Sequence, residues 1–366
     1  MKIMFYINSI RHGGAERVMC NLATKLSEKG NECILATSFE GEDEYTLGAN
    51  VKRVTFFKEK LRCNVIKRNL SLIKALRKQL KAEKPDVLIS FMAEPNYRAI
   101  FSSIGLKHKK IISIRNDPNR EYPKALNRFL AKNMFKCADG VVFQTEDAKN
   151  WFPKAIQKKS KIIFNQVDSA FYNAVYEGEH RDVVTTGRLV PQKNHKMLIR
   201  AFASVSNKIS DNLIIYGEGA LRPELEALIS ELGMENRIFL PGIAANVAET
   251  IKTAKLFVLS SDFEGMPNSL MEAMALGLPC ISTDCPCGGP KMLFGEESQS
   301  SLVPIGNAEE LATKMLSFLT DDEERKTIAS NLKKSAVQFS PDRIIGEWEA
   351  YIAKTVGLNI GGQNEN

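Results

Sequence analysis

The stretch LFVLSSDFEGMPNSLMEAMALGLPC, residues 256–280, joins an apolar run to an apolar helical pattern through a polar loop. Residues 256–261 are typical of a buried strand, while Pro267 and Gly277 are typical of a helix start and a helix stop. Because the helix between them is apolar nearly all round, we expect it to be buried. A strand followed by a helix that covers it is the repeating unit of a parallel sheet.

The same alternation of strand and helix recurs along the chain. One series of apolar runs begins at residue 2 and a second begins near residue 183. The predicted strands are residues 2–8, 32–37, 86–91, 110–114, 140–145, 183–187, 212–217, 237–242, 256–261 and 279–284. The helical patterns of the first series are residues 15–29, 64–83, 95–105 and 121–137. Two such series predict an α/β protein with two doubly wound parallel sheets.

The length of the chain also favours two domains. With 366 residues, of which 44% are hydrophobic, the chain is globular in composition and too long for one hydrophobic core. We expect a Rossmann-like N-terminal domain over residues 1–170, a Rossmann-like C-terminal domain over residues 171–340, and a helix over residues 341–358 that packs back on the N-terminal domain. No apolar run reaches the roughly 18 residues of a membrane span, and no signal-peptide pattern opens the chain, so we expect a cytoplasmic location.

The net charge of +7 is distributed unevenly. Residues 1–170 hold 32 Lys and Arg against 17 Asp and Glu, whereas the remainder holds 18 against 26. Residues 52–84 hold 12 basic side chains, with apolar residues interleaved at helical spacing. A solvated helix face is the common meaning of such a run, but we favour an amphipathic basic helix on an anionic membrane surface. Nucleic acid is less favoured because no binding motif accompanies the charge.

The seven cysteines favour neither a disulfide scaffold nor a zinc site. Their odd number and wide spacing fit a reducing compartment. Cys285 and Cys287 are one residue apart, and no second cysteine pair accompanies them in the sequence. The third glycine of a dinucleotide-binding pattern is replaced by Arg222, and the sequence has no serine-hydrolase elbow, Walker loop or zinc-protease motif. Dehydrogenase, hydrolase, ATPase and zinc-protease functions are therefore not favoured.

Glu264 and Glu272 are the two carboxylates of the opening stretch. Glu272 is the only charge after the first turn of the predicted buried helix, so it needs a polar partner in the protein or in a ligand. Glu264 is followed by Gly265, which lets the backbone approach a ligand closely. The N-terminus of the helix offers its amides to an anion. Together these features indicate a site for a phosphorylated ligand that carries hydroxyl groups.

These residues carry a resemblance to a known family. Glu264 and Glu272, with seven residues between them, match the E-x7-E signature of retaining glycosyltransferases of family 4 (group 1), and EGMPNSLMEAMALGLP resembles the donor-site segment of that family. Gly-Gly-Ala-Glu-Arg at 13–17, Thr-Gly-Arg-Leu at 186–189 and Tyr-Gly-Glu-Gly at 216–219 agree with it in order and spacing. The resemblance implies the GT-B fold, in which two Rossmann-like domains face a cleft. It is closest to bacterial enzymes that build capsule, exopolysaccharide or lipid-linked oligosaccharide.

The resemblance assigns catalytic roles to Arg188, Lys193 and Glu264. The two cations would stabilise the negative charge of the leaving nucleoside diphosphate without a metal ion, although an ordinary surface pair is the alternative interpretation. Glu264 would hold hydroxyl groups of the donor sugar, and Glu272 would hold the ribose. The other donor-binding residues that the family implies are Gly14, Gly187, Gly242, Ile243, Gly265, Met266, Pro267, Asn268, Ser269 and Leu270.

The N-terminal domain offers candidates for contact with the acceptor. Many family members carry a histidine near the reacting sugar where this chain has Arg115 and Asn116, and Arg115 would contact an acceptor phosphate or hydroxyl group. Glu94 is a second candidate, but a helix-capping carboxylate before Pro95 is an equally good interpretation. His12, beside the first glycine loop, is a third candidate for contact with the substrate. A solvent-exposed histidine is the ordinary interpretation of such a residue.

We therefore predict a retaining, metal-independent glycosyltransferase. It would transfer a hexose or N-acetylhexosamine from a UDP-sugar to a lipid-linked glycan in the synthesis of a surface polysaccharide or glycoconjugate, with no cofactor besides the donor. Its basic N-terminal domain would hold it on the inner face of the cell membrane. A sugar-nucleotide epimerase or hydrolase of the same fold and a non-catalytic glycan-binding scaffold are the alternatives.

Overall fold

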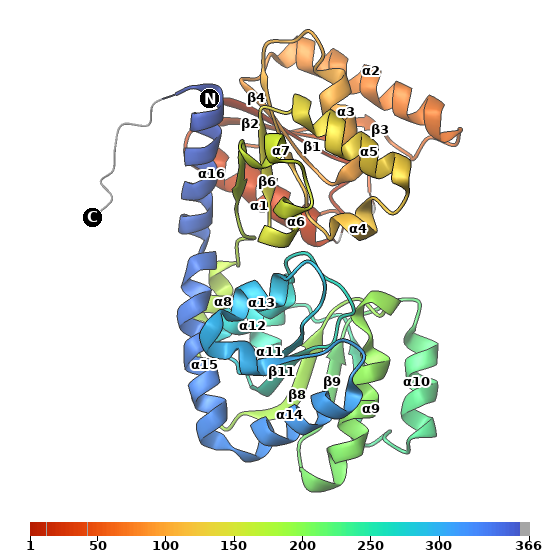
Figure 1. Cartoon of the computed structure of the whole chain (residues 1–366), viewed down its shortest axis with the longest axis vertical. Helices are drawn as coiled ribbons and strands as arrows, with labels where there is room; N and C mark the ends of the chain where they lie inside the picture. The colour runs from red at the N-terminus through yellow and green to blue at the C-terminus, as the bar shows by residue number, and fades with distance from the viewer. Residues whose placement is uncertain (12, 42, 359–366) are drawn as a thin grey trace, which may run out of the picture. The chain divides into compact units, whose positions relative to one another are not determined.

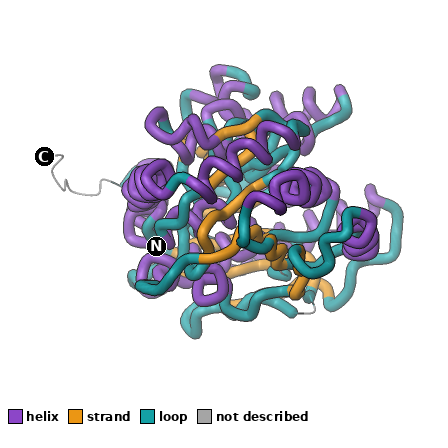
Figure 2. Tube along the Cα trace, turned by 90° about the horizontal axis from the view of Figure 1, so that it is seen from below, coloured by secondary structure: helices purple, strands orange, loops and turns teal. Residues whose placement is uncertain are grey.

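The computed structural model describes residues 1–11, 13–41 and 43–358. The chain forms two compact units: unit 1 combines the residues up to Asn165 with the segment that begins at Asp342, and unit 2 is Gln166–Pro341. Each unit contains one parallel sheet with helices packed against it (Figure 1). The tube view shows the strands in orange flanked by helices in purple (Figure 2). The prediction of two parallel α/β folds is confirmed.

The described residues of unit 1 form a seven-stranded sheet in the order β3-β2-β1-β4-β5-β6-β7. Its strands are β1 (Lys2–Ile7), β2 (Glu32–Phe39), β3 (Lys52–Phe57), β4 (Val87–Phe91), β5 (Lys109–Ser113), β6 (Gly140–Phe143) and β7 (Ser160–Ile162). Its helices are α1 (Gly14–Glu28), α2 (Val65–Glu83), α3 (Ala93–Ser102), α4 (Pro118–Glu121), α5 (Ala125–Met134), α6 (Glu146–Asn150), α7 (Lys154–Gln157) and α16 (Pro341–Val356). The order reverses between β1 and β4, which in parallel sheets is where ligands bind.

Unit 2 repeats this architecture with a six-stranded parallel sheet in the order β10-β9-β8-β11-β12-β13. Its strands are β8 (Arg181–Thr186), β9 (Leu213–Tyr216), β10 (Ile238–Gly242), β11 (Ala254–Leu259), β12 (Cys280–Thr283) and β13 (Leu302–Val303). Its helices are α8 (Ser169–Asn173), α9 (His195–Val205), α10 (Arg222–Glu231), α11 (Val247–Ile251), α12 (Asn268–Leu276), α13 (Gly289–Phe294), α14 (Ala308–Thr320) and α15 (Asp322–Ala336). The order reverses between β8 and β11, so the loops after these two neighbouring strands are the natural place for a site.

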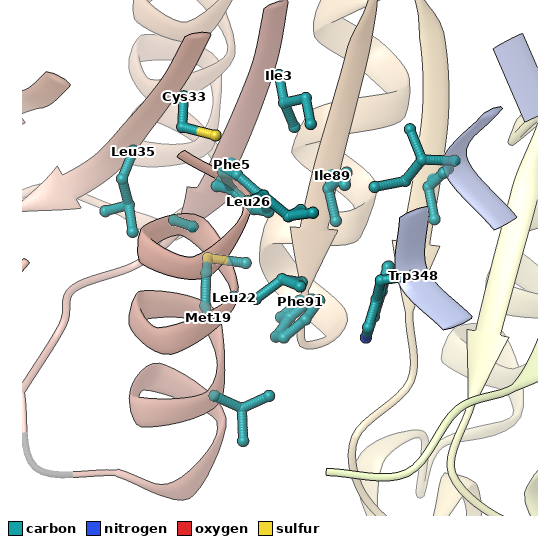
Figure 3. Packing of buried hydrophobic residues seen from close by; sticks show 14 of the residues in the cluster. Ile3, Phe5, Met19, Leu22, Leu26, Cys33, Leu35, Ile89, Phe91 and Trp348 are labelled. Atoms are coloured by element: carbon teal, nitrogen blue, oxygen red, sulfur yellow. The ribbon is translucent and has the colours of Figure 1, made fainter. Parts of the chain in front are cut away.

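The core of unit 1 explains why its central strands are continuous apolar runs. β1 and β4 are buried along nearly their whole length, and Ile3 pairs with Val87 in register. Strands that helices cover on both faces must be apolar at every position rather than at alternate positions. The close view shows α1 residues packed on this sheet, and it shows Trp348 of α16 beside Phe91 (Figure 3), with 5.9 Å between the ring centroids.

Helix α16 ties the C-terminal segment to unit 1. The Tyr351 hydroxyl donates to the Lys159 carbonyl at 2.6 Å and accepts the Val141 N–H at 2.8 Å. Lys29 pairs with Glu349 at 2.6 Å. These contacts, together with the buried indole of Trp348, make α16 part of the unit 1 core.

The structure differs from the sequence-based expectation in three strands that were not predicted, β3, β7 and β13, and in one divided helix. β3 lies within the basic segment and was not predicted, because it is a half-buried edge strand that begins with Lys52 and Arg53. The pattern predicted as one helix over residues 121–137 is divided among α4, α5 and a 3-10 turn at Phe135–Cys137. None of the described helices is both long enough and apolar enough to cross a membrane.

Candidate active site

The candidate site of unit 2 lies at the carboxyl edge of its sheet. The loop after β8 carries Arg188 and Lys193, and the loop after β11 carries Glu264. Because β8 and β11 are adjacent parallel strands, their following loops emerge side by side. The fold thus brings together residues that lie 71 positions apart in the chain.

Lys193 and Glu264 form an ion pair at this edge. Lys193 Nζ lies 2.7 Å from Glu264 Oε1, and the two side chains are only 14% and 10% exposed. The Ser261 hydroxyl donates to the same Oε1 atom at 2.8 Å. Glu264 Oε2 accepts no hydrogen bond from any residue that the structure describes. One oxygen of a well-oriented carboxylate is therefore left for a ligand.

A hydrogen-bond network, which sequence reasoning missed, joins the two loops. Asn194 adopts left-handed backbone geometry with a φ of 43°, and its side chain caps α9 by accepting the Met197 N–H. The Asn194 amide donates to Asp262 Oδ1 at 2.7 Å, and the Ser260 hydroxyl donates to the Lys193 carbonyl at 2.9 Å. The network fixes the backbone on both sides of the ion pair. The only sign of this network in the sequence is an asparagine just before a predicted helix. That sign does not indicate which residues the asparagine would bind.

The loops after β8, β9 and β10 meet through their backbones. Gly217 has a φ of 149°, and a Cβ at this position would lie 1.9 Å from the Gly187 oxygen, so only glycine fits. The Gly217 N–H donates to the Gly242 carbonyl at 2.8 Å. Ile243 follows with a side chain that is 76% exposed. This edge of unit 2 thus places the exposed Ile243 side chain beside the close-packed backbone of three loops.

Helix α12 begins directly after the β11 loop. Pro267 was expected to be the first helical residue, but it directly precedes the helix. It supplies no side-chain cap to the first-turn amides. The Ser269 hydroxyl is buried and has no hydrogen-bond partner within the described part of the chain. Met266 and Leu270 are buried at the loop and in the helix, where they exclude water. Asn268 is the first helical residue.

The buried character of α12 agrees with the sequence-based expectation. Residues 270–275 are all buried, and Glu272 is 5% exposed in the second turn of the helix. Gly265 is packed against the start of α13, where a Cβ on Gly289 would lie 2.0 Å from the Gly265 oxygen. The loop that carries Glu264 is thereby held between α12 and α13.

Arg188 and His195 complete the loop after β8. The Arg188 side chain is exposed, and its guanidinium forms no ion pair with a described residue. His195 is 2% exposed, and its Nε2 donates to the Arg188 carbonyl at 3.3 Å. Burial lowers the pKa of His195 to about 4, so the ring is neutral at pH 7. His195 therefore fixes the Arg188 backbone and adds no charge of its own.

The predicted residues after β5 of unit 1 are engaged in structural contacts. Arg115 is 8% exposed, its guanidinium lies 4.4 Å from the centre of the Phe91 ring, and it donates to Asn165 Oδ1. Burial lowers the pKa of Arg115 to about 9. Asn116 Oδ1 accepts the Asp117 N–H at 2.9 Å, which forms a turn.

Two of the remaining predicted residues of unit 1 follow β1 and β4, the strands between which the sheet order reverses. Gly14 is the first residue of α1. Glu94, in the first turn of α3, pairs with Arg98 at 2.5 Å and remains 54% exposed. His12 lies outside the described residues. Arg98 was not predicted, because a helical arginine carries no signal of burial in a sequence.

The cysteines and acidic residues do not form a metal cluster in the part of the chain that the structure describes. No group of three or more His, Cys, Asp or Glu residues there could hold a metal ion. Cys285 and Cys287 are buried thiols. Burial raises the pKa of the Cys285 thiol to about 12, which keeps it protonated and unreactive.

Two family models cover most of the chain. Residues 173–335 match the model described as "Glycosyl transferases group 1", and residues 12–171 match the model described as "Glycosyltransferase Family 4". The protein is a family 4 glycosyltransferase. The resemblance inferred from the E-x7-E segment is thus confirmed, together with the GT-B class of fold.

Two relatives of this glycosyltransferase are named for their activities. It is 31% identical to the Campylobacter jejuni "GalNAc-alpha-(1->4)-GalNAc-alpha-(1->3)-diNAcBac-PP-undecaprenol alpha-1,4-N-acetyl-D-galactosaminyltransferase", over 97% of this chain and 99% of the relative. It is 28% identical to a second C. jejuni enzyme, the "N-acetylgalactosamine-N,N'-diacetylbacillosaminyl-diphospho-undecaprenol 4-alpha-N-acetylgalactosaminyltransferase", over 96% and 99%. Among solved structures, Anabaena HepE in complex with UDP and glucose has a TM-score of 0.80 at 20% identity, over 97% of this chain and 100% of HepE.

Proposed function

We propose that this glycosyltransferase moves a hexose or N-acetylhexosamine from a UDP-sugar to a lipid-linked glycan, with retention of configuration, in the synthesis of a surface polysaccharide or glycoconjugate. The observation that carries the proposal is the oriented Lys193–Glu264 pair at the carboxyl edge of unit 2. A cation there suits the donor diphosphate, and a carboxylate beside it suits the sugar hydroxyl groups.

The donor diphosphate would bind between Lys193, Arg188 and the start of α12. Arg188 is exposed and available, and the α12 N-terminus directs its first-turn amides and the buried Ser269 hydroxyl toward an anion. Negative charge grows on the diphosphate as the glycosidic bond breaks. Fixed cations and helix amides stabilise that charge without reorganising, and we propose that they do so without a metal ion.

The uridine and the sugar would occupy the flanking loops. Glu264 Oε2 would accept hydrogen bonds from the sugar, because Oε1 is already engaged by Lys193 and Ser261. Glu272 would bind the ribose. The backbone at the end of β10, at Gly242 and the exposed Ile243, would contact the base.

Retention would follow from attack on the face that UDP leaves. The acceptor oxygen bonds to C1 as the bond from C1 to the phosphate oxygen breaks, and the acceptor proton passes to an oxygen of the departing diphosphate. The engagement of Glu264 Oε1 by a cation and a hydroxyl favours a hydrogen-bonding role over a nucleophilic one. A glycosyl adduct trapped on Glu264 would contradict this step.

Unit 1 would bind the acceptor and the membrane. The names of the two Campylobacter relatives describe acceptors built on diphospho-undecaprenol. The first turns of α2 expose Val65, Ile66 and Leu70 to 58%, 74% and 53%, beside the basic side chains of the same helix. Exposed apolar residues with flanking cations are typical of a helix that lies in the membrane interface.

Thermal unfolding with UDP, GDP and ADP tests the donor part of the proposal. At about 100 times its dissociation constant, a ligand adds roughly 2.7 kcal/mol to the free energy of unfolding. We expect UDP to stabilise the protein more than GDP or ADP, and UDP-sugars to be consumed only when an acceptor is present. Consumption of a UDP-sugar without an acceptor would instead support the epimerase or hydrolase alternative, and no response to any nucleotide would contradict the proposal.

A further inference from the structure

The segment of unit 2 that carries Lys193 is hydrogen-bonded to the loop after β11. The Gln192 carbonyl accepts the Asp262 N–H at 2.9 Å, and Gln192 Nε2 donates to the Phe263 carbonyl at 2.9 Å. The Lys193 carbonyl accepts the Ser260 hydroxyl at 2.9 Å. The backbone is therefore held at Lys193 and at the residue before it.

Asn194 directly follows Lys193 and makes two further contacts. Its φ of 43° and ψ of 45° lie in the left-handed region, which asparagine and aspartate tolerate better than most residues. Its Oδ1 accepts the Met197 N–H at 3.2 Å and caps α9, while its Nδ2 donates to Asp262 Oδ1 at 2.7 Å. Because both ends of one amide are bound, the backbone that follows Lys193 is also fixed.

The Asp262 carboxylate projects from a braced part of the β11 loop. The preceding residue, Ser261, donates its hydroxyl to Glu264 Oε1 at 2.8 Å, and its carbonyl accepts the Thr283 hydroxyl at 2.5 Å. A carboxylate on a fixed backbone is a strong and directional acceptor for an amide N–H. Asp262 thus couples the position of the β11 loop to Asn194, and Asn194 couples it to Lys193.

These contacts determine where the Lys193 side chain begins. That side chain is only 14% exposed, and its Nζ lies 2.7 Å from Glu264 Oε1. The direction of such a side chain depends on the backbone that carries it. A misplacement of about 1 Å in a group that faces the reacting atoms can lower a rate by about 100-fold. The residues that hold the Lys193 backbone therefore control how its ammonium meets a ligand.

We propose that Asn194 and Asp262 are positioning residues that direct the Lys193 ammonium to the terminal phosphate of the departing UDP. This inference rests on the proposed function, because it deepens the role given there to Lys193. The terminal phosphate gains negative charge as the glycosidic bond breaks, and a cation that is already in place stabilises that charge. The contact between Asn194 and Asp262 acts on the leaving group and not on the uridine.

A purely structural role of the Asn194–Asp262 contact makes a different prediction. If the contact only braced the fold, its loss would lower thermal stability and weaken every nucleotide alike. If it positions Lys193, its loss weakens UDP, which carries the terminal phosphate, and leaves UMP, which lacks that phosphate, unaffected. Comparison of the two nucleotides therefore separates the two roles.

Calorimetry with UDP and UMP on Asn194→Asp tests the positioning role. The variant keeps an oxygen for the Met197 N–H but places a second carboxylate against Asp262, so the two side chains repel each other. We expect UDP to bind about tenfold more weakly and UMP to bind as in the wild-type protein. Equal losses for UDP and UMP, or no loss for either, would overturn the proposal.

The double variant Asn194→Asp/Asp262→Asn exchanges the donor and the acceptor. The hydrogen bond can form again in the opposite direction, the α9 cap keeps an oxygen, and the net charge is that of the wild-type protein. We expect UDP affinity to return to within about threefold of wild type. A double variant that unfolds at the wild-type temperature but binds UDP as weakly as Asn194→Asp would overturn the proposal.

Asn194→Gly keeps the test decisive if the double variant does not fold. Glycine adopts the left-handed geometry without strain, so this change removes the side-chain contacts and retains the backbone conformation. We expect weaker UDP binding and unchanged UMP binding. Wild-type affinity for UDP in this variant would show that the Asn194 side chain has no positioning role.

Asn307→Asp is the matched control in unit 2. Asn307 caps α14 by accepting the Glu310 N–H at 3.0 Å, and its Nδ2 donates to Glu310 Oε2 at 3.0 Å. The change thus places two carboxylates together at another helix start, outside the candidate site. We expect UDP affinity to stay within about twofold of wild type. A loss equal to that of Asn194→Asp would overturn the proposal.

The wild-type protein separates this inference from the proposed function. If it binds UDP and transfers the sugar, and if Asn194→Asp does both equally well, the inference alone is overturned. If the wild-type protein does not bind UDP, the proposed function itself is contradicted. We expect kcat for transfer to farnesyl-diphospho-N-acetylglucosamine to fall in Asn194→Asp and to recover in Asn194→Asp/Asp262→Asn.

Discussion

Lys193 and Glu264 are held 2.7 Å apart by loops from two adjacent strands of unit 2, and both side chains are largely buried. Removing one partner of such a pair leaves the other charge uncompensated, which costs about 3 kcal/mol or more. Loss of activity in a single variant could therefore arise from loss of structure. A double variant separates the two causes.

We predict that Lys193→Gln lowers kcat/KM by about 100-fold, because one fixed donor to a developing anion contributes that much. Thermal stability should also fall. In Lys193→Gln/Glu264→Gln the stability should return while the activity does not. Lys196→Gln is the control, since Lys196 is an exposed lysine of the next helix and pairs with Glu224 at the surface. Recovery of activity in the double variant would show that the Lys193–Glu264 pair has only a structural role, and would contradict its role in catalysis.

Glu272 is predicted to bind the ribose of UDP. If so, Glu272→Gln should weaken UDP about tenfold, the usual loss when a charged hydrogen-bond acceptor is removed. It should leave 2′,3′-dideoxy-UDP, which lacks the ribose hydroxyl groups, almost unaffected. Isothermal titration of both nucleotides measures the difference. Equal losses for the two nucleotides in a folded variant would assign Glu272 to the packing of α12 rather than to the ligand.

The exposed apolar residues of α2 should control membrane binding. We expect Ile66→Asn to reduce flotation with vesicles of phosphatidylglycerol by several-fold, because it removes a 74% exposed side chain from the proposed interface. Binding should weaken as salt rises, since the flanking cations are screened. Ile305→Asn removes an exposed isoleucine of unit 2 and should leave flotation unchanged. Similar results for both variants would contradict the assignment of α2.

A buried carboxyl group predicts a pH dependence of stability. Glu121 accepts the Ala93 N–H at 2.9 Å, and its second oxygen is buried with no partner from the described residues. Burial raises the pKa of Glu121 from 4.5 to about 7. Its stabilising contribution is therefore complete below pH 4.5 and is lost as the pH rises through 7.

Glu121→Gln stays neutral at every pH and should remove this effect. Between pH 5 and pH 8, the wild-type free energy of unfolding should fall relative to that of the variant by about 2 to 3 kcal/mol. Urea denaturation at the two pH values measures it. Parallel pH profiles for the two proteins would show that Glu121 is already ionised in the fold at pH 5.

The sequence predicts the two sheets, which the structure confirms, but it does not predict how the candidate donor residues meet, and their roles stay predictions. Strand runs such as residues 86–91 are apolar at every position, and this pattern identifies them without tertiary information. β3 was not predicted because an edge strand needs only partial burial. It tolerates Lys52 and Arg53 and therefore lacks a continuous apolar run. The pairing of Lys193 with Glu264 depends on strand order, which the local sequence does not encode.

Arg98 shows the same limit more sharply. In the sequence it is one basic residue among many in a basic half of the chain. In the fold it is 2% exposed and donates hydrogen bonds to the side chains of Asn8, Asn69 and Glu94. Burial of an arginine depends on carboxylate and amide partners from distant segments, so only the three-dimensional structure reveals it.

The anomeric configuration of the transfer product tests the central claim most directly. Farnesyl-diphospho-N-acetylglucosamine and an α-linked UDP-N-acetylhexosamine would be incubated with the protein, and the new linkage would be assigned by NMR. The account predicts an α-linked sugar on the prenyl diphosphate glycan, together with one UDP per transfer. A β-linked product, or UDP with free sugar and no glycan product, would contradict it.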